Sequence, residues 1–289
     1  MELTRFDEAA TFYRRVEAFL LAREAEHNLI LGLCANLMQH PERVEAPPYL
    51  ALVEGAGGPV AAAVMTPPHQ LVLSSTAARE ALGLIAEDIH RVRPTLPGVS
   101  GPKAESRAFA AGWQRVSGQP YRLRMAERIY QLERVTPVTG APGELRRATA
   151  ADRDLAVAWM AAFYGEALGE DDIRAAERSV AARLAGGDSG LYFWVDGRPV
   201  SMTGYGGPTP NGIRIAPVYT PPELRGRGYA SACVAATSQR LLDEGRRYCF
   251  LYTDLSNPTS NHIYQAIGYR PVCDVDAYAF EPAPGTATA

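Results

Sequence analysis

The sequence predicts an α/β (α+β) protein that contains two copies of one fold. Its 289 residues are enough for two ordinary domains. Both halves order their elements alike, with helical stretches first, then a hairpin, then a strand that leads into another helix. The hairpins VEGAGGPVAAAV and VDGRPVSMTGY occupy equivalent places. A linker with two prolines and two glycines, VTPVTGAPGE, divides the chain into expected domains at 1–136 and 143–289.

The composition is that of a soluble globular protein, because 47% of the residues are hydrophobic and 21% are charged. The net charge is −3 and basic residues form no run, so we expect no nucleic-acid partner. No apolar stretch approaches the roughly 20 residues that span a bilayer, so no membrane association is expected. The N-terminus carries acidic residues and lacks the apolar core of a leader peptide, which favours a cytoplasmic protein.

Cysteines and histidines give no sign of a metal centre. The five histidines are isolated from one another in the sequence. The four cysteines lack the close spacing of a metal site, and we interpret them as reduced thiols: Cys34, Cys233, Cys249 and Cys273. We therefore expect neither a metal nor a disulfide bond.

The first half is expected to begin with helices and to continue with strands. Hydrophobic positions recur at helical spacing over 6–26 and 29–39, and again over 76–92. A fourth helical stretch contains FAAGWQRV. The expected strands are YLALVE and PVAAAVM on either side of a Gly-rich turn, then QLVLSS, and finally the alternating run YRLRMAERIYQL.

The second half repeats this order. Asp196-Gly197 predicts a hairpin between LYFWV and PVSMTGYG, since Asp-Gly accepts the positive φ of a type I′ turn. Before the hairpin we expect the strand ELRRAT, a helix over 152–164, and a helix that starts at Asp171-Asp172 and ends at Gly186-Gly187. After it we expect the strand GIRIAPVYT, a helix over 231–244, the strand YCFLYT, a helix over 258–267, and a final strand or pair over 269–280.

The turn after GIRIAPVYT combines glycines with arginines. Beyond two prolines the chain reads Arg225-Gly226-Arg227-Gly228-Tyr229-Ala230. Main-chain N–H groups at a helix N-terminus lack helical partners, and the helix dipole adds partial positive charge, so such a turn binds anions. Glycines let the main chain approach the ligand closely, and arginines add charge for phosphate oxygens. The sequence therefore predicts a pyrophosphate site.

Three phosphate-binding patterns distinguish the possible ligands. The P-loop pattern, which ends in Gly-Lys-Ser/Thr, does not occur in the sequence. The dinucleotide-binding fingerprint fits only in part, because Ser231 stands at its third position and the pattern lies five residues beyond the strand. The pattern Arg/Gln-x-x-Gly-x-Gly/Ala is complete at Arg225, Gly228 and Ala230. A dinucleotide-binding protein remains open as an alternative.

With these residues the second half resembles the GNAT superfamily of N-acetyltransferases. The strand before the turn ends in Val218-Tyr219-Thr220, as is common in that family. Downstream, LYTDLSNPTSNHIYQAIGY places Asn257, Ser260, Tyr264 and Gly268 at the spacing of a second family motif.

The resemblance implies two tandem GNAT-like domains, each a mixed, mostly antiparallel sheet flanked by helices. Its two motifs cover roughly 190–271. In the first half the corresponding turn, SSTAAREALG, has no glycine before Gly83. Acetyl-CoA is therefore expected to bind only the second domain.

The resemblance also implies an acetyl-CoA-dependent N-acetyltransferase, in which an amine attacks the thioester directly. Tyr264 is the candidate general acid, because a tyrosine hydroxyl with a pKa of ~10 suits proton donation to the departing thiolate. A main-chain N–H near Tyr219 would polarise the thioester carbonyl. The residues implied to bind acetyl-CoA, as co-substrate, are Val218, Tyr219, Thr220, Arg225, Gly226, Arg227, Gly228, Tyr229, Ala230, Asn257 and Tyr264.

The acceptor is expected to be a small-molecule or peptide amine, which the sequence does not identify further. Glu223 fits a supporting role in the loop better than that of a base. The sequence is compatible with a monomer or a homodimer. A non-catalytic acetyl-CoA-binding sensor or interaction module is the alternative function. The resemblance implies that the acceptor groove is lined by Phe163, Tyr164, Glu166, Glu170 and Tyr278.

Overall fold

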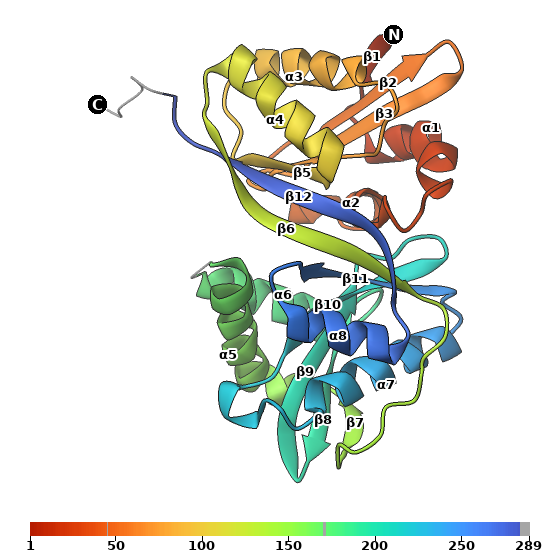
Figure 1. Cartoon of the computed structure of the whole chain (residues 1–289), viewed down its shortest axis with the longest axis vertical. Coiled ribbons are helices and arrows are strands. Elements are labelled where there is room, and N and C mark those ends of the chain that lie inside the picture. The colour runs from red at the N-terminus through yellow and green to blue at the C-terminus, as the bar shows by residue number, and fades with distance from the viewer. Residues whose placement is uncertain (45, 170–171, 284–289) are drawn as a thin grey trace. The chain divides into compact units, whose positions relative to one another are not determined.

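The computed structural model describes residues 1–44, 46–169 and 172–283, and these form two compact units (Figure 1). The first unit contains Met1–Ile129, Tyr252–Asn257 and the described residues from Pro271 onward. The second contains Tyr130–Leu251 and Pro258–Arg270. The sequence-predicted domains are continuous segments, whereas each compact unit is assembled from separate stretches of the chain.

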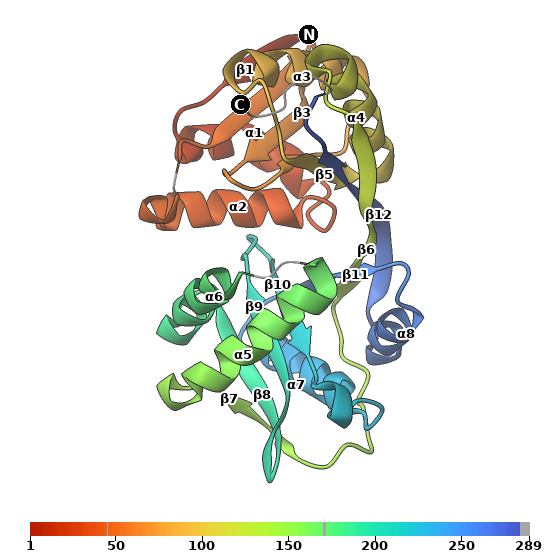
Figure 2. The same ribbon diagram turned by 90° about the vertical axis from the view of Figure 1, so that its left-hand side faces the viewer.

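The first unit is a mixed sheet with two helices on each face (Figure 2). Its strand order is β1-β2-β3-β4-β5-β12, antiparallel except for the parallel pair β4 and β5. The strands are β1 (Glu2–Arg5), β2 (Tyr49–Gly55), β3 (Gly58–Met65), β4 (Leu71–Leu73), β5 (Gly98–Pro102) and β12 (Arg270–Phe280). The helices are α1 (Ala9–Leu21), α2 (Asn28–Gln39), α3 (Glu80–Val92) and α4 (Lys103–Ser117), with the short 3₁₀ turn η1 (Pro41–Arg43) after α2.

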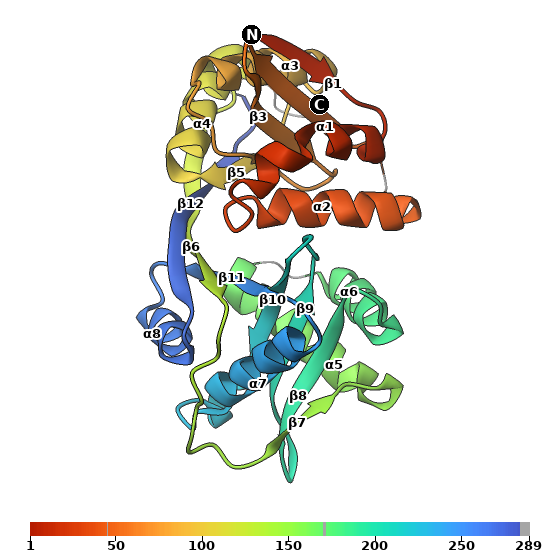
Figure 3. The same cartoon turned by 90° about the vertical axis from the view of Figure 1, so that its right-hand side faces the viewer.

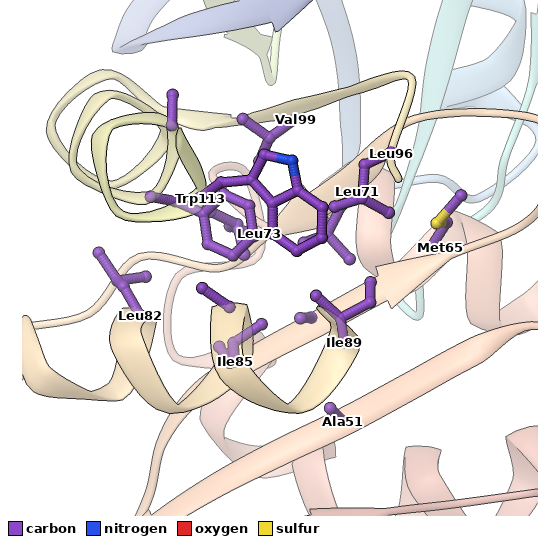
Figure 4. Close-up of a cluster of buried hydrophobic side chains, with 14 of the residues drawn as sticks. Ala51, Met65, Leu71, Leu73, Leu82, Ile85, Ile89, Leu96, Val99 and Trp113 are labelled. Carbon is purple, nitrogen blue, oxygen red and sulfur yellow. The ribbon is translucent and has the colours of Figure 1, made fainter. Parts of the chain in front are cut away.

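Both faces of this sheet are buried, because its central strands carry long apolar runs. In β2, Ala51 and Val53 face α3 and α4, whereas Leu50 and Leu52 face α1 and α2. Trp113 fills the centre of the first of these clusters (Figure 4). Such unbroken apolar runs are typical of a strand covered on both sides.

The second unit repeats the plan (Figure 3). Its strand order is β11-β10-β9-β8-β7, antiparallel except for the parallel pair β10 and β11. The strands are β7 (Glu144–Arg147), β8 (Gly190–Asp196), β9 (Arg198–Gly206), β10 (Gly212–Tyr219) and β11 (Tyr248–Asp254). The helices are α5 (Arg153–Phe163), α6 (Ile173–Ala185), α7 (Tyr229–Asp243) and α8 (Pro258–Ile267), with the short turns η2 (Ala150–Asp152), η3 (Tyr164–Leu168) and η4 (Pro222–Leu224). Helices α5 and α6 pack on one face and α7 and α8 on the other.

Strand β6 (Tyr121–Leu132) contributes to both units, up to Ile129 in the first and from Tyr130 in the second. The last strand, β12, was expected in the second domain, but from Pro271 it belongs to the first unit. There it pairs with β5, and Val275 lies opposite Pro102. The expected final strand or pair is therefore one strand.

Most expected elements form close to the expected places. The hairpin at Asp196-Gly197 joins β8 and β9, with Gly197 at a φ of 67°. Strands β1 and β5 were not predicted, and α3 begins at Glu80 instead of residue 76. All four cysteines are free. Among the described residues, no helix is long and apolar enough to cross a membrane, and no group of three or more acidic, His or Cys side chains could hold a metal ion.

Candidate functional site

The candidate site starts where strand β10 departs from regular pairing. β10 pairs in parallel with β11 over Gly212–Arg214. Its register with β9 then shifts between Ile215 and Val218. An irregularity of this kind bends a strand and frees main-chain groups from the ladder. The bend precedes Val218, Tyr219 and Thr220, which the sequence analysis predicted as the first part of the site.

The turn that follows β10 presents a row of main-chain N–H groups. Gly226 and Gly228 have φ values of 76° and 78°, a left-handed conformation that glycine adopts without strain. The first hydrogen bond of α7 runs from the N–H of Ala232 to the carbonyl of Gly228. Within the described ranges, no acceptor is recorded for the N–H groups from Gly226 to Ser231. Together with the dipole of α7, these donors form a site suited to an anion such as a pyrophosphate.

The side chain of Arg225 is engaged by the protein itself. Its Nε donates to the carbonyl of Thr220 over 2.9 Å, and its Nη2 lies 2.6 Å from a carboxylate oxygen of Glu166. The guanidinium also lies over the ring of Tyr219, 5.9 Å from its centroid. Burial raises the pKa of Tyr219, and the negative charge of Glu166 raises it further. Through these contacts, Arg225 and Glu166 hold the end of β10 and the start of the turn in place.

The start of α7 is fixed by a small apolar cluster and one hydrogen bond. Leu224 and Tyr229 are buried together with Val200, and Ala141 of the linker packs against them. The Tyr229 hydroxyl donates to Asp196 over 2.7 Å. A Cβ atom on Gly228 would lie 3.6 Å from the Cβ of Ala141, in ordinary contact. The linker thus borders the turn without filling the position of Gly228.

Tyr264 lies in α8, in the cluster that joins α7 and α8 to the sheet. It is 9% exposed, and its ring packs edge-on against Tyr269 with 6.0 Å between centroids. Burial raises the pKa of Tyr264 to about 12. The hydroxyl therefore keeps its proton across the neutral range, as a proton donor must.

The structure brings most of the predicted residues onto one strand–turn–helix. Asn257 falls in the part of the chain that belongs to the first unit, where its N–H donates to the carbonyl of Asp254. Tyr278 also lies in the first unit, where its hydroxyl donates to Asp276. Glu166 forms an ion pair with Arg225, and its side chain remains about half exposed. Glu170 lies outside the described residues.

The equivalent turn of the first unit, between β4 and α3, is closed by side chains. The N–H of Ser75 donates to Nε2 of His27 over 3.1 Å, and the Ser75 hydroxyl lies 2.9 Å from the same nitrogen. The N–H of Thr76 donates to Glu105 over 3.0 Å. His27 is 2% exposed, and its Nδ1 lies 3.0 Å from the carbonyl of Leu20. The sequence offered no signal for His27, because its partner is 48 residues away.

Several solved structures are similar to the chain over nearly its whole length. A Drosophila protein is 11% identical with a TM-score of 0.69, over 97% of this chain and 99% of that one. A GCN5-related N-acetyltransferase from Sphaerobacter thermophilus is 16% identical with a TM-score of 0.61, over 96% and 94%. A tandem GNAT protein from the clavulanic acid biosynthesis pathway is 14% identical with a TM-score of 0.57, over 99% of both chains. At these identities the likeness shows the fold, and it confirms the predicted fold class.

The sequence comparison defines the class of protein more closely. No curated protein matches the chain. Residues 153–269 match the model of the acetyltransferase (GNAT) family. The second half therefore carries an acyltransferase domain. It is a GNAT domain, and its matched segment includes both the bent strand β10 and the glycine-containing turn before α7.

Proposed function

We propose that the protein is an acetyl-CoA-dependent N-acetyltransferase that moves an acetyl group to the amine of an acceptor. The observation that supports this most directly is the row of N–H groups from Gly226 to Ser231, which follows a bent strand inside a GNAT domain. These groups fit the pyrophosphate of acetyl-CoA, because the glycine positions leave room and the dipole of α7 attracts negative charge. We also propose that the protein is cytoplasmic and that it is a monomer or a homodimer.

Each part of the strand–turn–helix has its own role in this proposal. Val218 and Thr220 present main-chain groups to the pantetheine arm, and a main-chain N–H near Tyr219 faces the thioester carbonyl. Gly226, Arg227, Gly228, Tyr229 and Ala230 hold the pyrophosphate, chiefly through their main chain. Arg225 keeps the turn in place through Thr220 and Glu166. Asn257 completes the set of proposed binding residues.

Tyr264 supplies the proton for the departing thiolate. Its raised pKa, about 12, makes it a weaker acid than a free tyrosine, but it guarantees that the proton is present. The bond that breaks is the thioester C–S bond, and the bond that forms joins the acyl carbon to the amine nitrogen. The thiolate sulfur receives the Tyr264 proton, the nitrogen releases one proton to solvent, and Tyr264 regains a proton from solvent.

The first unit is proposed not to bind acetyl-CoA. Two of the N–H groups in the equivalent turn, those of Ser75 and Thr76, already donate to His27 and Glu105. Breaking these hydrogen bonds would leave a buried histidine and its partners unsatisfied, at a cost of about 1–3 kcal/mol for each group.

A thiol-release assay tests the proposal. Acetyl-CoA is supplied with a panel of amines, amino acids, polyamines, aminoglycosides and peptides, and free CoA thiol is measured. Release that depends on an amine, together with an acetylated amine in the mass spectrum, supports the proposal. Tight binding of acetyl-CoA without turnover on any amine would instead indicate a sensor or interaction module.

A further inference from the structure

Arg183 lies in α6, on the face of the second sheet that α5 and α6 cover, and it is partly buried. Its Nη1 donates to the carbonyl of Tyr205 at the end of β9, and its Nε donates to the hydroxyl of Ser179 over 3.4 Å. A guanidinium has five N–H donors. In the described part of the chain these two acceptors are recorded, so three donors remain for another ligand.

The charge of Arg183 has no recorded carboxylate partner among the described residues. Burial, with a smaller contribution from the nearby positive charge of Arg214, lowers its pKa to about 10. The groups that favour the charged form are the hydroxyls of Tyr164 and Tyr205. The guanidinium still carries its charge at neutral pH. A buried charge without a counter-ion is costly, so the site favours the arrival of an anion.

Two consecutive glycines make room for both guanidiniums. A Cβ atom on Gly206 would lie 3.4 Å from Nη1 of Arg183. A Cβ atom on Gly207 would lie 2.8 Å from Nη2 of Arg214, so this guanidinium would have to shift if a side chain were present. Arg183 and Arg214 therefore gather at one point, where β9 ends.

This point lies close to the proposed acyl-transfer site. Tyr205, which holds Arg183, pairs with Ile215 of β10, the last residue before the bend. Val218 follows three residues later, at a distance of about 10 Å for an extended chain. Tyr164, near Arg183, opens the turn η3, in which Glu166 contacts Arg225. The arginines thus lie on the same strand as the proposed thioester site, toward its N-terminal end.

We propose that Arg183, with Arg214 beside it, binds a carboxylate of the acceptor, so that the acceptor is an amine that also carries a carboxylate. The inference rests on the proposed function, because the amine must reach the acetyl group bound near Val218. A planar guanidinium with free donors binds a carboxylate through two parallel hydrogen bonds, which fixes the orientation of the acceptor as well as its charge.

The test uses ω-amino acids of increasing length, from glycine to 6-aminohexanoate, each paired with its amide. The amide keeps the amine and the chain but removes the negative charge. For at least one length, we expect kcat/KM for the acid to exceed that for the amide by about tenfold or more. The chain length with the largest ratio of acid to amide indicates the distance between the carboxylate site and the site of acetyl transfer. Equal kcat/KM for acid and amide at every length would overturn the inference.

The variant Arg183→Gln assigns the preference to this residue. We expect the ratio of acid to amide to fall to within about twofold of one, while the KM for acetyl-CoA stays unchanged. Arg174→Gln, on an exposed position of the same helix, is the matched control and should keep the wild-type ratio. A purely structural role for Arg183 would lower both rates together and keep the ratio, which would contradict the inference. If Arg183→Gln does not fold, Arg214→Gln is measured in the same way.

Failure of the proposed function gives a different result. In that case no acetyl group is transferred to any member of the series. Calorimetric titration of the acids and amides into the CoA-saturated protein then tests the arginines alone. Tighter binding of an acid than of its amide, lost in Arg183→Gln, supports the carboxylate site. Equal binding, or none, overturns it.

Discussion

The turn from β4 to α3 in the first unit and the turn from β10 to α7 in the second occupy the same place in the same order of elements. They differ in what their main-chain N–H groups contact. In the first, Ser75 and Thr76 donate to the side chains of His27 and Glu105. In the second, no acceptor is recorded for the donors from Gly226 to Ser231, all of which lie in the described ranges. Side chains of the protein occupy part of the first turn, whereas the second is open to an anion.

The comparison teaches that one fold can keep or lose a ligand site through a few side chains. Closing the first turn required a buried histidine from the segment before α2 and a glutamate from the first turn of α4. Keeping the second turn open required glycines at two positions with positive φ. The rest of the two sheets did not have to change. The predictions below are ordered from the largest expected effect to the smallest.

Gly228→Asp is expected to weaken acetyl-CoA binding by about 100-fold or more, because a carboxylate would occupy the anion position and repel the phosphates. The affinity is measured by calorimetry. Gly245→Asp, at the other end of α7, is the matched control, since Gly245 also has a positive φ and no neighbour within 4 Å of an added Cβ. Binding of Gly228→Asp within twofold of wild type would rule out this turn as the pyrophosphate site.

Tyr264→Phe keeps the ring that packs on Tyr269 and removes the hydroxyl. We expect kcat to fall by at least about tenfold, with little change in the KM for acetyl-CoA. Steady-state kinetics with chemistry rate-limiting provide the measurement. Because the pKa of Tyr264 is raised to about 12, the wild-type rate should show no loss from this group below about pH 11. An unchanged kcat would remove Tyr264 from the mechanism.

His27 is expected to make the first unit less stable in acid. Burial lowers its pKa, against smaller contributions from its neighbours, so the folded state holds it neutral and the unfolded chain protonates it first. Its contribution to stability is complete above the unfolded value of about 6.5 and is lost as the pH falls below it.

The measurement is the urea midpoint of unfolding at pH 7.5 and pH 5.5. The midpoint should be lower at pH 5.5. In His27→Gln, whose amide oxygen can accept from Ser75 without titrating, the difference between the two pH values should shrink. If the urea midpoint of the wild type depends on pH no more than that of this variant, the acid sensitivity does not come from His27.

Glu166→Gln is expected to have the smallest effect. The pair with Arg225 is short, but both side chains are 48% exposed, and such pairs contribute only about 0.2–1 kcal/mol. The Kd for acetyl-CoA should therefore rise by about two- to fourfold through a looser turn. A double-mutant cycle with Arg225→Gln measures the coupling. Purely additive effects would mean that the pair does not support the turn.

Local patterns made much of the second half predictable. Asp196-Gly197 specifies its own hairpin, and the glycines at 226 and 228 mark a turn that only they can adopt without strain. Helix α8 begins and ends at the predicted residues because proline starts it and Gly268 follows it. In these places the conformation depends on residues close in sequence.

Other features depend on residues far apart in sequence. Strand β5 has five residues, among them two glycines and a proline, and it exists because β4 and β12 pair with it from either side. Gly101 packs so closely on Leu73 that an added Cβ would lie 3.0 Å from its carbonyl oxygen. The contacts of His27 with Ser75 and of Glu166 with Arg225 span 48 and 59 residues. No periodicity in the sequence reports such pairs.

The number of acetyl-CoA molecules bound by each chain tests the central claim most directly. Calorimetric titration of the intact protein is expected to give one site per chain, and Gly228→Asp is expected to abolish that site while Gly245→Asp keeps it. Two sites in the wild-type chain, or one site that survives in Gly228→Asp, would contradict the account.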